Sequence, residues 1–135
     1  MEKRKFTAAI YARTDEADGQ RSWDEIDRQH NACHASAARL GIDVVANVDD
    51  LGQPGDKTNR PGIAQLLAHA AHRPFDYAMV SSIDRLADRA EQLNYLLLRL
   101  KNLGATVLMA DHDTAIELVL PSDMEVLHGA DDDRS

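Results

Sequence analysis

The chain has 135 residues, of which 44% are hydrophobic and 28% charged, and its formal net charge is −8. This length suits one domain with a substantial core, and no apolar run reaches the ~20 residues of a membrane span. The basic start, residues 1–6, lacks the apolar segment of a signal peptide, and the single cysteine, Cys33, excludes an internal disulfide. We therefore expect a cytoplasmic protein without membrane association. The negative charge argues against a main role in gripping nucleic acid, which needs a basic face.

The first half of the chain alternates between strand and helix patterns. Ser22 and Glu25 have capping-box spacing, so a helix should begin at Ser22, and Gly41 should end it. The break after the second strand is rich in glycine, proline and polar residues, which is typical of a long loop. The predicted elements are a strand, a loop, a helix, a strand and a loop over residues 7–13, 14–21, 22–40, 42–48 and 49–59.

The second half continues the same alternation. Pro61 suits the first turn of a helix and Gly104 the end of one. The predicted elements are a helix, a strand, a helix and two strands over residues 61–72, 75–81, 88–103, 105–110 and 115–120. This order predicts an α/β fold, a three-layer domain with a mainly parallel central sheet of four to five strands. We expect the domain to span residues 1–120, with an acidic, disordered tail over 121–135.

Four short motifs place charged residues around the predicted strand ends: Tyr11-Ala12-Arg13-Thr14-Asp15, Asp49-Asp50-Leu51-Gly52, Asn59-Arg60-Pro61-Gly62 and Ile83-Asp84-Arg85-Leu86. In type and order they resemble the catalytic domain of the serine recombinases, which include resolvases, invertases and large serine integrases. The family's versions read Tyr-x-Arg-x-Ser, Asp-Glu-Gly, Asp-Arg-Pro-Gly and Leu-Asp-Arg-Leu. The resemblance covers residues from about 7 to 113 and implies a resolvase-type fold.

The resemblance also implies a site for a DNA phosphodiester. In that family the motif serine attacks the phosphate, and arginines hold it and stabilise the developing negative charge. Here Asp15 stands at the serine position, and Asp88 stands where the large integrases have an arginine. The site that the resemblance assigns comprises Tyr11, Arg13, Asp15, Arg60, Asp84, Arg85 and Asp88, of which the phosphate-binding positions are Arg13, Arg60 and Arg85.

Two carboxylates at a phosphate site change its chemistry. They repel DNA phosphate, and an attack by Asp15 would give a hydrolysable acyl phosphate instead of a phosphoester that can be religated. Thr14 should point to the opposite face of the strand, and Ser81 and Ser82 read as turn residues, so none is expected to replace the nucleophile. We interpret the site as degenerate, with no intact catalytic residue, internal salt bridges, and at most weak DNA binding.

Three functions remain open. The main hypothesis is a catalytically inactive recombinase-like domain that acts through protein contacts, as a homodimer or by modulating an intact recombinase. The alternatives are an active recombinase or nicking enzyme with an altered site, and a metal-dependent phosphoryl hydrolase using Asp15 and Asp111. Residues 114–135 are too short for the dimerisation helix and DNA-binding domain that follow the catalytic core in the family.

Weaker patterns have structural explanations. The helical spacing of His30, Cys33 and His34, and the carboxylates of residues 111–113, could serve a metal, but a helix flank and a turn explain them, so we expect neither metal nor cofactor. A leucine stripe over residues 93–103 predicts a buried helix face. Tyr95 and Leu98 add apolar surface beside that stripe, which favours a protein partner or homodimer through this helix.

Overall fold

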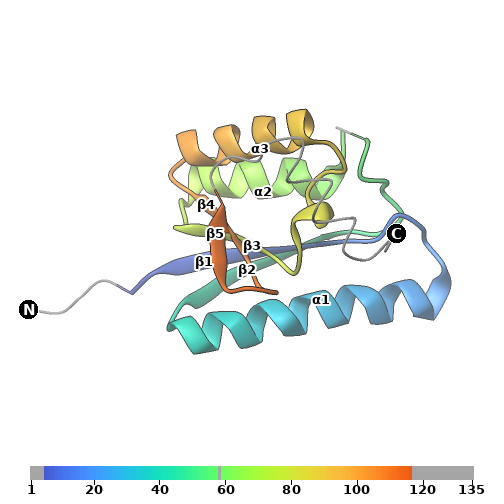
Figure 1. The fold of residues 1–135 in the computed structure, drawn as a ribbon, viewed down its shortest axis with the longest axis horizontal. Helices are drawn as coiled ribbons and strands as arrows, with labels where there is room; N and C mark the ends of the chain where they lie inside the picture. Colours follow the sequence, from blue (N-terminus) through green and yellow to red (C-terminus); the bar gives the residue numbers. More distant parts are fainter. Residues whose placement is uncertain (1–4, 58, 117–135) are drawn as a thin grey trace, which may run out of the picture.

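The computed structural model describes residues 5–57 and 59–116 and has a five-stranded sheet between two helical layers (Figure 1). The strand order is β2-β1-β3-β4-β5, with β5 antiparallel to β4 and the other pairs parallel. This confirms the predicted fold class. None of the helices in the described ranges has the length and hydropathy of a membrane span. The elements are β1 (Thr7–Arg13), α1 (Gly19–Leu40), β2 (Asp43–Asp50), α2 (Pro61–His72), β3 (Tyr77–Val80), the 3₁₀ helix η1 (Ile83–Arg85), α3 (Ala90–Asn102), β4 (Thr106–Met109) and β5 (Thr114–Ile116).

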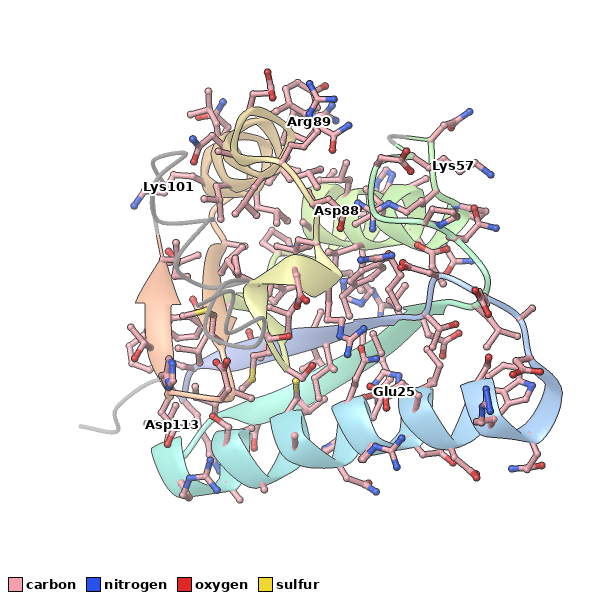
Figure 2. All side chains as sticks on the ribbon, turned by 45° about the vertical axis from the view of Figure 1, so that its right-hand side comes forward. Glu25, Lys57, Asp88, Arg89, Lys101 and Asp113 are labelled. Carbon is pink, nitrogen blue, oxygen red and sulfur yellow. The ribbon has the colours of Figure 1, made fainter. Side chains whose placement is uncertain are left out.

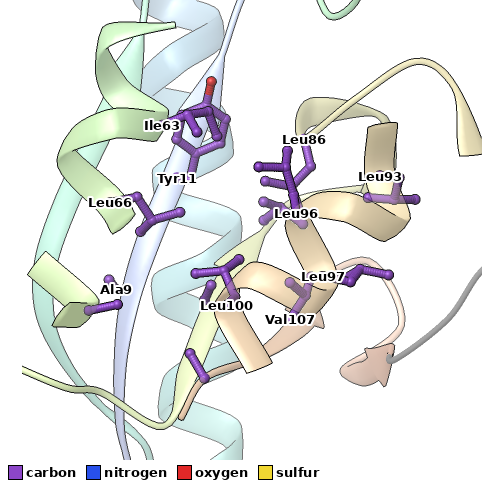
Figure 3. Close-up of a cluster of buried hydrophobic side chains, with 14 of the residues drawn as sticks. Ala9, Tyr11, Ile63, Leu66, Leu86, Leu93, Leu96, Leu97, Leu100 and Val107 are labelled. Carbon is purple, nitrogen blue, oxygen red and sulfur yellow. The ribbon is translucent and has the colours of Figure 1, made fainter. Parts of the chain in front are cut away.

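Strand β1 is the centre of the sheet and explains the apolar run at the start of the chain. It pairs in parallel with β2 on one side and β3 on the other, and its residues 8–12 are fully buried. Successive side chains alternate between the faces. Ala9 and Tyr11 pack in the core that includes α2 and α3 (Figure 3). Ala8 and Ile10 pack in the core that includes α1.

Helices α2 and α3 cover one face of the sheet, and α1 covers the other (Figure 1). The leucine stripe of α3 is buried as predicted, with Leu93, Leu96, Leu97 and Leu100 in the core against Leu66 and the strands (Figure 3). The opposite face of α3 is different. Tyr95 is 58% exposed and Leu98 61% exposed, so the outward face of this helix keeps two large apolar side chains in solvent.

The start of α1 was predicted wrongly. The helix begins at Gly19 with Asp18 as N-cap, and no side chain caps it by a hydrogen bond. Ser22 lies inside the first turns, where its hydroxyl donates to the Glu16 carbonyl and accepts from the Asp18 amide. The serine thus holds the preceding loop against the helix instead of capping the helix N-terminus. The other terminus is as predicted, with Gly41 in the left-handed conformation at φ 71°.

The remaining boundaries differ because tertiary pairing and a short 3₁₀ helix override the local pattern. β2 continues to Asp50, since that residue pairs with Arg13 of β1. The prediction missed η1, and α3 consequently begins at Ala90 instead of residue 88. β3 and β4 are shorter than predicted, and β5 begins at Thr114. Residues 117–120 of the predicted last strand, and the predicted tail at 121–135, lie outside the described residues.

Candidate functional site

The predicted site residues gather at the carboxyl end of the central parallel strands. β1 ends at Arg13, β3 leads through Ser81 and Ser82 into η1, and Arg60 directly precedes α2. In Figure 2, Glu25 lies on α1 at one side of this edge and Asp88 lies at the other. Parallel α/β sheets place their functional groups at this edge, which is where the sequence predicted the site.

Arg13 is the centre of the site. Its side chain is only 3% exposed, and its guanidinium donates to three backbone carbonyls. Nε bonds the carbonyl of Arg85 at 2.8 Å, while the two terminal nitrogens bond the carbonyls of Gln53 at 2.9 Å and Asp84 at 2.6 Å. The loop after β2 and the helix η1 therefore both close on this one guanidinium.

Two carboxylates complete the surroundings of Arg13. Asp15 forms an ion pair and hydrogen bond with one terminal nitrogen, and an Asp88 carboxylate oxygen lies 3.7 Å from the other. Both carboxylates stay partly solvated, at 64% and 45% exposure. Gly55 lies against the same group, because a side chain there would overlap Asp88 and come within 2.7 Å of the Arg13 guanidinium. The pairing of both aspartates with a site arginine agrees with the prediction of internal salt bridges.

Arg60 and Tyr11 form a second, buried group beside Arg13. Arg60 is 3% exposed and donates to the Tyr11 hydroxyl at 3.1 Å and to the Leu86 carbonyl. Tyr11 in turn donates to Asp50 at 2.6 Å, and the other Asp50 oxygen accepts the Gly62 amide at 2.6 Å. Burial raises the pKa of Tyr11 far above its usual value despite the nearby Arg60 charge, so its phenol remains a donor. The same burial lowers the pKa of Arg60.

Arg85 turns away from the Arg13–Arg60 group towards α1. Its guanidinium contacts Glu25 at 3.1 Å and the Arg13 carbonyl at 3.5 Å. Burial of Glu25 opposes ionisation, but hydrogen bonds from Arg28 and Gln29, together with the Arg85 charge, outweigh it and lower the Glu25 pKa. Arg85 is thus held by a carboxylate that itself has several donors.

Asp84 and the candidate replacement nucleophiles have local partners. The Asp84 carboxylate accepts from the Ser82 hydroxyl at 2.6 Å, and only its carbonyl reaches Arg13. Thr14 is 7% exposed, and its hydroxyl donates to the Glu16 carbonyl and accepts the Gly52 amide. These contacts suit turn formation, which is the role that the sequence predicted for Ser82.

An open depression of about 350 Å³ lies between the site and the start of α1. Its charged lining consists of four carboxylates and two guanidiniums, from Asp15, Glu16, Asp18, Glu25, Arg21 and Arg85. The excess of carboxylates makes this opening unfavourable for a phosphate anion.

The weaker metal candidates do not form clusters. Among residues 5–57 and 59–116, no group of three His, Cys, Asp or Glu side chains is placed to hold a metal ion. His30 faces Asp49 at 3.6 Å and His34 contacts Asn47 at 3.0 Å, while burial raises the pKa of Cys33 to about 12. Asp113, at φ 50°, bonds Ser36 and pairs with Arg39 on α1, which makes it a turn anchor.

Three residues that support the site were not predicted from the sequence. Gln29 is 2% exposed, and its amide both donates to and accepts from the Arg13 backbone at 2.9 Å. Glu25 holds Arg85, and Gln53 contributes a carbonyl to Arg13. Glu25 and Gln29 are four residues apart and share a helix face, a spacing that could have indicated a polar helix surface facing the strand end. The contribution of Gln53 comes from its backbone and has no sequence signal.

A family model of the resolvase N-terminal domain matches residues 8–128. The chain belongs to this family. No curated protein sequence matches the chain. Among solved structures, the N-terminal catalytic domain of TP901-1 integrase superposes with a TM-score of 0.74 at 21% identity, covering 95% of this chain and 96% of that one. A resolvase family site-specific recombinase from Streptococcus pneumoniae gives 0.70 at 14% identity, with 96% and 89% covered.

The C-terminal catalytic domain of ISC1926 TnpA, an IS607-like serine recombinase, gives a TM-score of 0.69 at 24% identity, with 78% of this chain and 70% of that chain covered. At such identities the structural likeness establishes the resolvase fold and no more. That Asp15 replaces the nucleophilic serine of the family, and that Asp88 replaces an arginine, stay predictions from the motifs.

Proposed function

We propose that this resolvase-family domain does not cleave DNA and acts through protein contacts, in a regulatory or structural role. One observation carries the proposal. The Arg13 guanidinium, which the family motif would assign to the phosphate, has acceptors from within the chain around all three of its nitrogens. A phosphate binding there would have to displace Asp15 and Asp88, the two carboxylates that already neutralise the Arg13 guanidinium.

The other two arginines support the same conclusion. Arg60 donates to Tyr11 and to two carbonyls, and Arg85 pairs with Glu25. Stabilising a pentavalent phosphate requires donors aimed at the oxygens where charge develops. The terminal nitrogens of Arg60 and Arg85 that already have protein acceptors cannot donate in this way unless the surrounding loop and η1 rearrange, whereas the Nε of each is buried without an acceptor among the described residues.

The residue types at the strand end also disfavour recombination. Serine attack would give a phosphoester that preserves bond energy for religation, whereas a carboxylate such as Asp15 would give a mixed anhydride that water hydrolyses. The Thr14 hydroxyl donates to the Glu16 carbonyl, which cannot take its proton as a base. The Ser82 hydroxyl donates to the Asp84 carboxylate two residues further on, in a local contact at the start of η1.

The test is a search for a covalent protein–DNA intermediate. Purified protein is incubated with supercoiled plasmids carrying a genomic library from its own source, quenched in detergent, and analysed for plasmid relaxation and for nucleotide adducts by mass spectrometry. An intact serine recombinase with its own site-bearing plasmid serves as the positive control. We expect neither relaxation nor adduct, and a nucleotide attached to any residue of this chain would refute the proposal.

The single variant Asp15→Ser distinguishes two explanations for the expected inactivity, the loss of the nucleophile alone and a site altered at several positions. We expect this variant to remain inactive in the same assay, because Asp88 still neutralises Arg13 and the other arginines keep their internal partners. Relaxation or adduct formation by Asp15→Ser alone would show that the phosphate site is otherwise functional.

A further inference from the structure

A cavity of about 210 Å³ lies between the loop after β2 and the first turns of α3, with Arg60 in its wall. It is separate from the position that the family motif assigns to phosphate, because Arg13, Asp15 and Arg85 do not line it. For comparison, an engineered cavity of about 150 Å³ holds a benzene molecule. This cavity therefore has room for one aromatic ring with small substituents.

Most of the cavity surface is apolar, and Tyr95 and Leu96 of α3 contribute the largest apolar side chains to it. Leu96 is held in the core, whereas Tyr95 is 58% exposed. A half-exposed aromatic ring at the wall of a cavity gains contact area when a flat apolar molecule packs against it. These two side chains favour a ligand with an aromatic ring.

The charged side chains around the cavity leave it positive. Lys57, Arg60 and Glu91 line it, which gives two cations against one anion. Glu91 pairs with Arg89 at 3.2 Å, so its charge already has a partner. Lys57 donates to the neutral side chain of Gln53 at 2.9 Å. Within residues 5–57 and 59–116, neither Lys57 nor Arg60 forms an ion pair with a carboxylate, so the cavity favours an anion.

Arg60 is the more important of the two cations because its charge is buried. Its side chain bonds the Tyr11 hydroxyl and main-chain carbonyls through the terminal nitrogens, but its Nε is buried without an acceptor among the described residues. Asp50 attracts Arg60, yet this carboxylate bonds Tyr11 and the Gly62 amide. Burial, together with the Arg13 charge, lowers the Arg60 pKa. A carboxylate in the cavity would supply the missing negative charge.

Gln92 adds an acceptor that has no donor. Its Nε2 donates to the Asp56 carbonyl at 3.0 Å, and this bond joins the loop to α3. Its Oε1 is buried and has no donor in the part of the chain that the structure describes. A buried polar atom without a partner costs free energy, which a ligand recovers by pairing with it. A hydroxyl group on the ligand would be a suitable donor.

We propose that this cavity binds a small aromatic monocarboxylate that carries a hydroxyl group, of the hydroxybenzoate type. The carboxylate lies towards Arg60 and Lys57. The ring packs against Tyr95 and Leu96, and the hydroxyl bonds Gln92. The inference goes beyond the proposed function and does not depend on it. A ligand of about ten non-hydrogen atoms with these contacts should have a dissociation constant of the order of 0.1 to 1 mM.

Titration of the full chain with meta- and para-hydroxybenzoate tests the ligand class. Binding is followed by nitrogen-15 NMR of the Arg60 Nε–H and the Gln92 side-chain amide. We expect the better of the two isomers to bind at least about threefold more tightly than benzoate, which lacks the hydroxyl, and about tenfold more tightly than its uncharged amide. Acetate, which has no ring, should bind at least about tenfold more weakly. Equal binding of acetate would mean an adventitious ion only and would refute the proposal.

The variant Lys57→Met tests the charge at the cavity, and Lys101→Met is its matched control. Lys101 also belongs to the α3 layer but does not line the cavity, and Figure 2 shows Lys57 and Lys101 on opposite sides of the molecule. Each variant removes one exposed ammonium and keeps an unbranched side chain. We expect Lys57→Met to weaken hydroxybenzoate binding by about threefold to tenfold and Lys101→Met by less than about twofold.

Two further variants test the ring and the hydroxyl. Tyr95→Ala should weaken all of the aromatic ligands by at least about fivefold, whereas Leu98→Ala, at a 61% exposed position outside the cavity lining, should leave them unchanged. Gln92→Leu should retain benzoate binding and abolish the preference for hydroxybenzoate over benzoate. A preference that persists in Gln92→Leu would contradict the contact between the hydroxyl and this residue.

Three outcomes overturn the site as a whole. The first is a wild-type chain whose Arg60 and Gln92 signals show no saturable change at about ten times the expected dissociation constant. The second is binding that both Lys57→Met and Tyr95→Ala leave unchanged. The third is full competition by dimethyl phosphate, which would assign the anion to the predicted phosphate site. None of these results bears on strand cleavage, which the covalent-adduct assay measures separately.

Discussion

Replacing Asp15 and Asp88 by asparagine removes two negative charges from the surroundings of Arg13 with little change in side-chain size. A phosphodiester that bound this guanidinium would lie about as far from each carboxylate as Arg13 does, and the Asp88 oxygen is 3.7 Å away. Both carboxylates are about half exposed or more, so a water-like dielectric applies. Coulomb's law then gives about 1 kcal/mol of repulsion per carboxylate at 4 Å.

Removing both charges should therefore improve phosphate binding by about 2 kcal/mol, or about thirtyfold. Dimethyl phosphate is a suitable probe because it has the charge of a DNA phosphodiester. Its binding can be followed at low ionic strength by nitrogen-15 NMR of the Arg13 Nε–H, which lies inside the site. Low salt matters because exposed charges are screened.

The matched control changes Asp24 and Asp43 to asparagine. These exposed carboxylates lie away from Arg13, and their loss changes net charge equally. We expect the control to change the affinity by less than about twofold. If Asp15→Asn/Asp88→Asn binds dimethyl phosphate no better than the wild type, or if the control improves binding as much, the two carboxylates do not block a phosphate site. The reasoning behind the proposed function would then fail.

Two further predictions concern stability. Asp50→Ala removes the acceptor for the Tyr11 hydroxyl and for an amide in the first turn of α2. We expect it to lower the free energy of unfolding, measured by urea titration, by about 3 to 5 kcal/mol. The control Asp43→Ala, on the same strand, should lower it by less than about 1 kcal/mol. A loss equal to that of Asp43→Ala would contradict the importance of this buried network. Burial lowers the pKa of His30 below 6.5 despite the opposing charge of Asp49, so the unfolded chain takes up the proton first. The contribution of neutral His30 to stability is complete above pH 6.5 and declines as the pH falls through the pKa of the folded state. This loss of stability at low pH should be smaller in His30→Gln. An equal loss in the variant would assign the pH dependence to another group.

The local sequence was sufficient for the order and type of most elements. An unbroken apolar run predicted the buried strand β1, since a central parallel strand has both faces covered. Glycine at Gly41 predicted a helix end because it adopts a left-handed backbone at little cost. The leucine period of α3 predicted its buried face and left Tyr95 and Leu98 outside it.

Tertiary structure decided what local signals could not. Ser22 has the spacing of a cap, but its hydroxyl bonds the preceding loop, and the helix begins three residues earlier. The charge at Asp15 was visible in the sequence, whereas its pairing with Arg13 depends on a loop and a 3₁₀ helix converging on one guanidinium. Periodicity reports which face of an element is apolar, because that depends on neighbours a few residues away. The partners of a buried charge come from distant segments, and backbone carbonyls such as that of Gln53 carry no signal in side-chain identity.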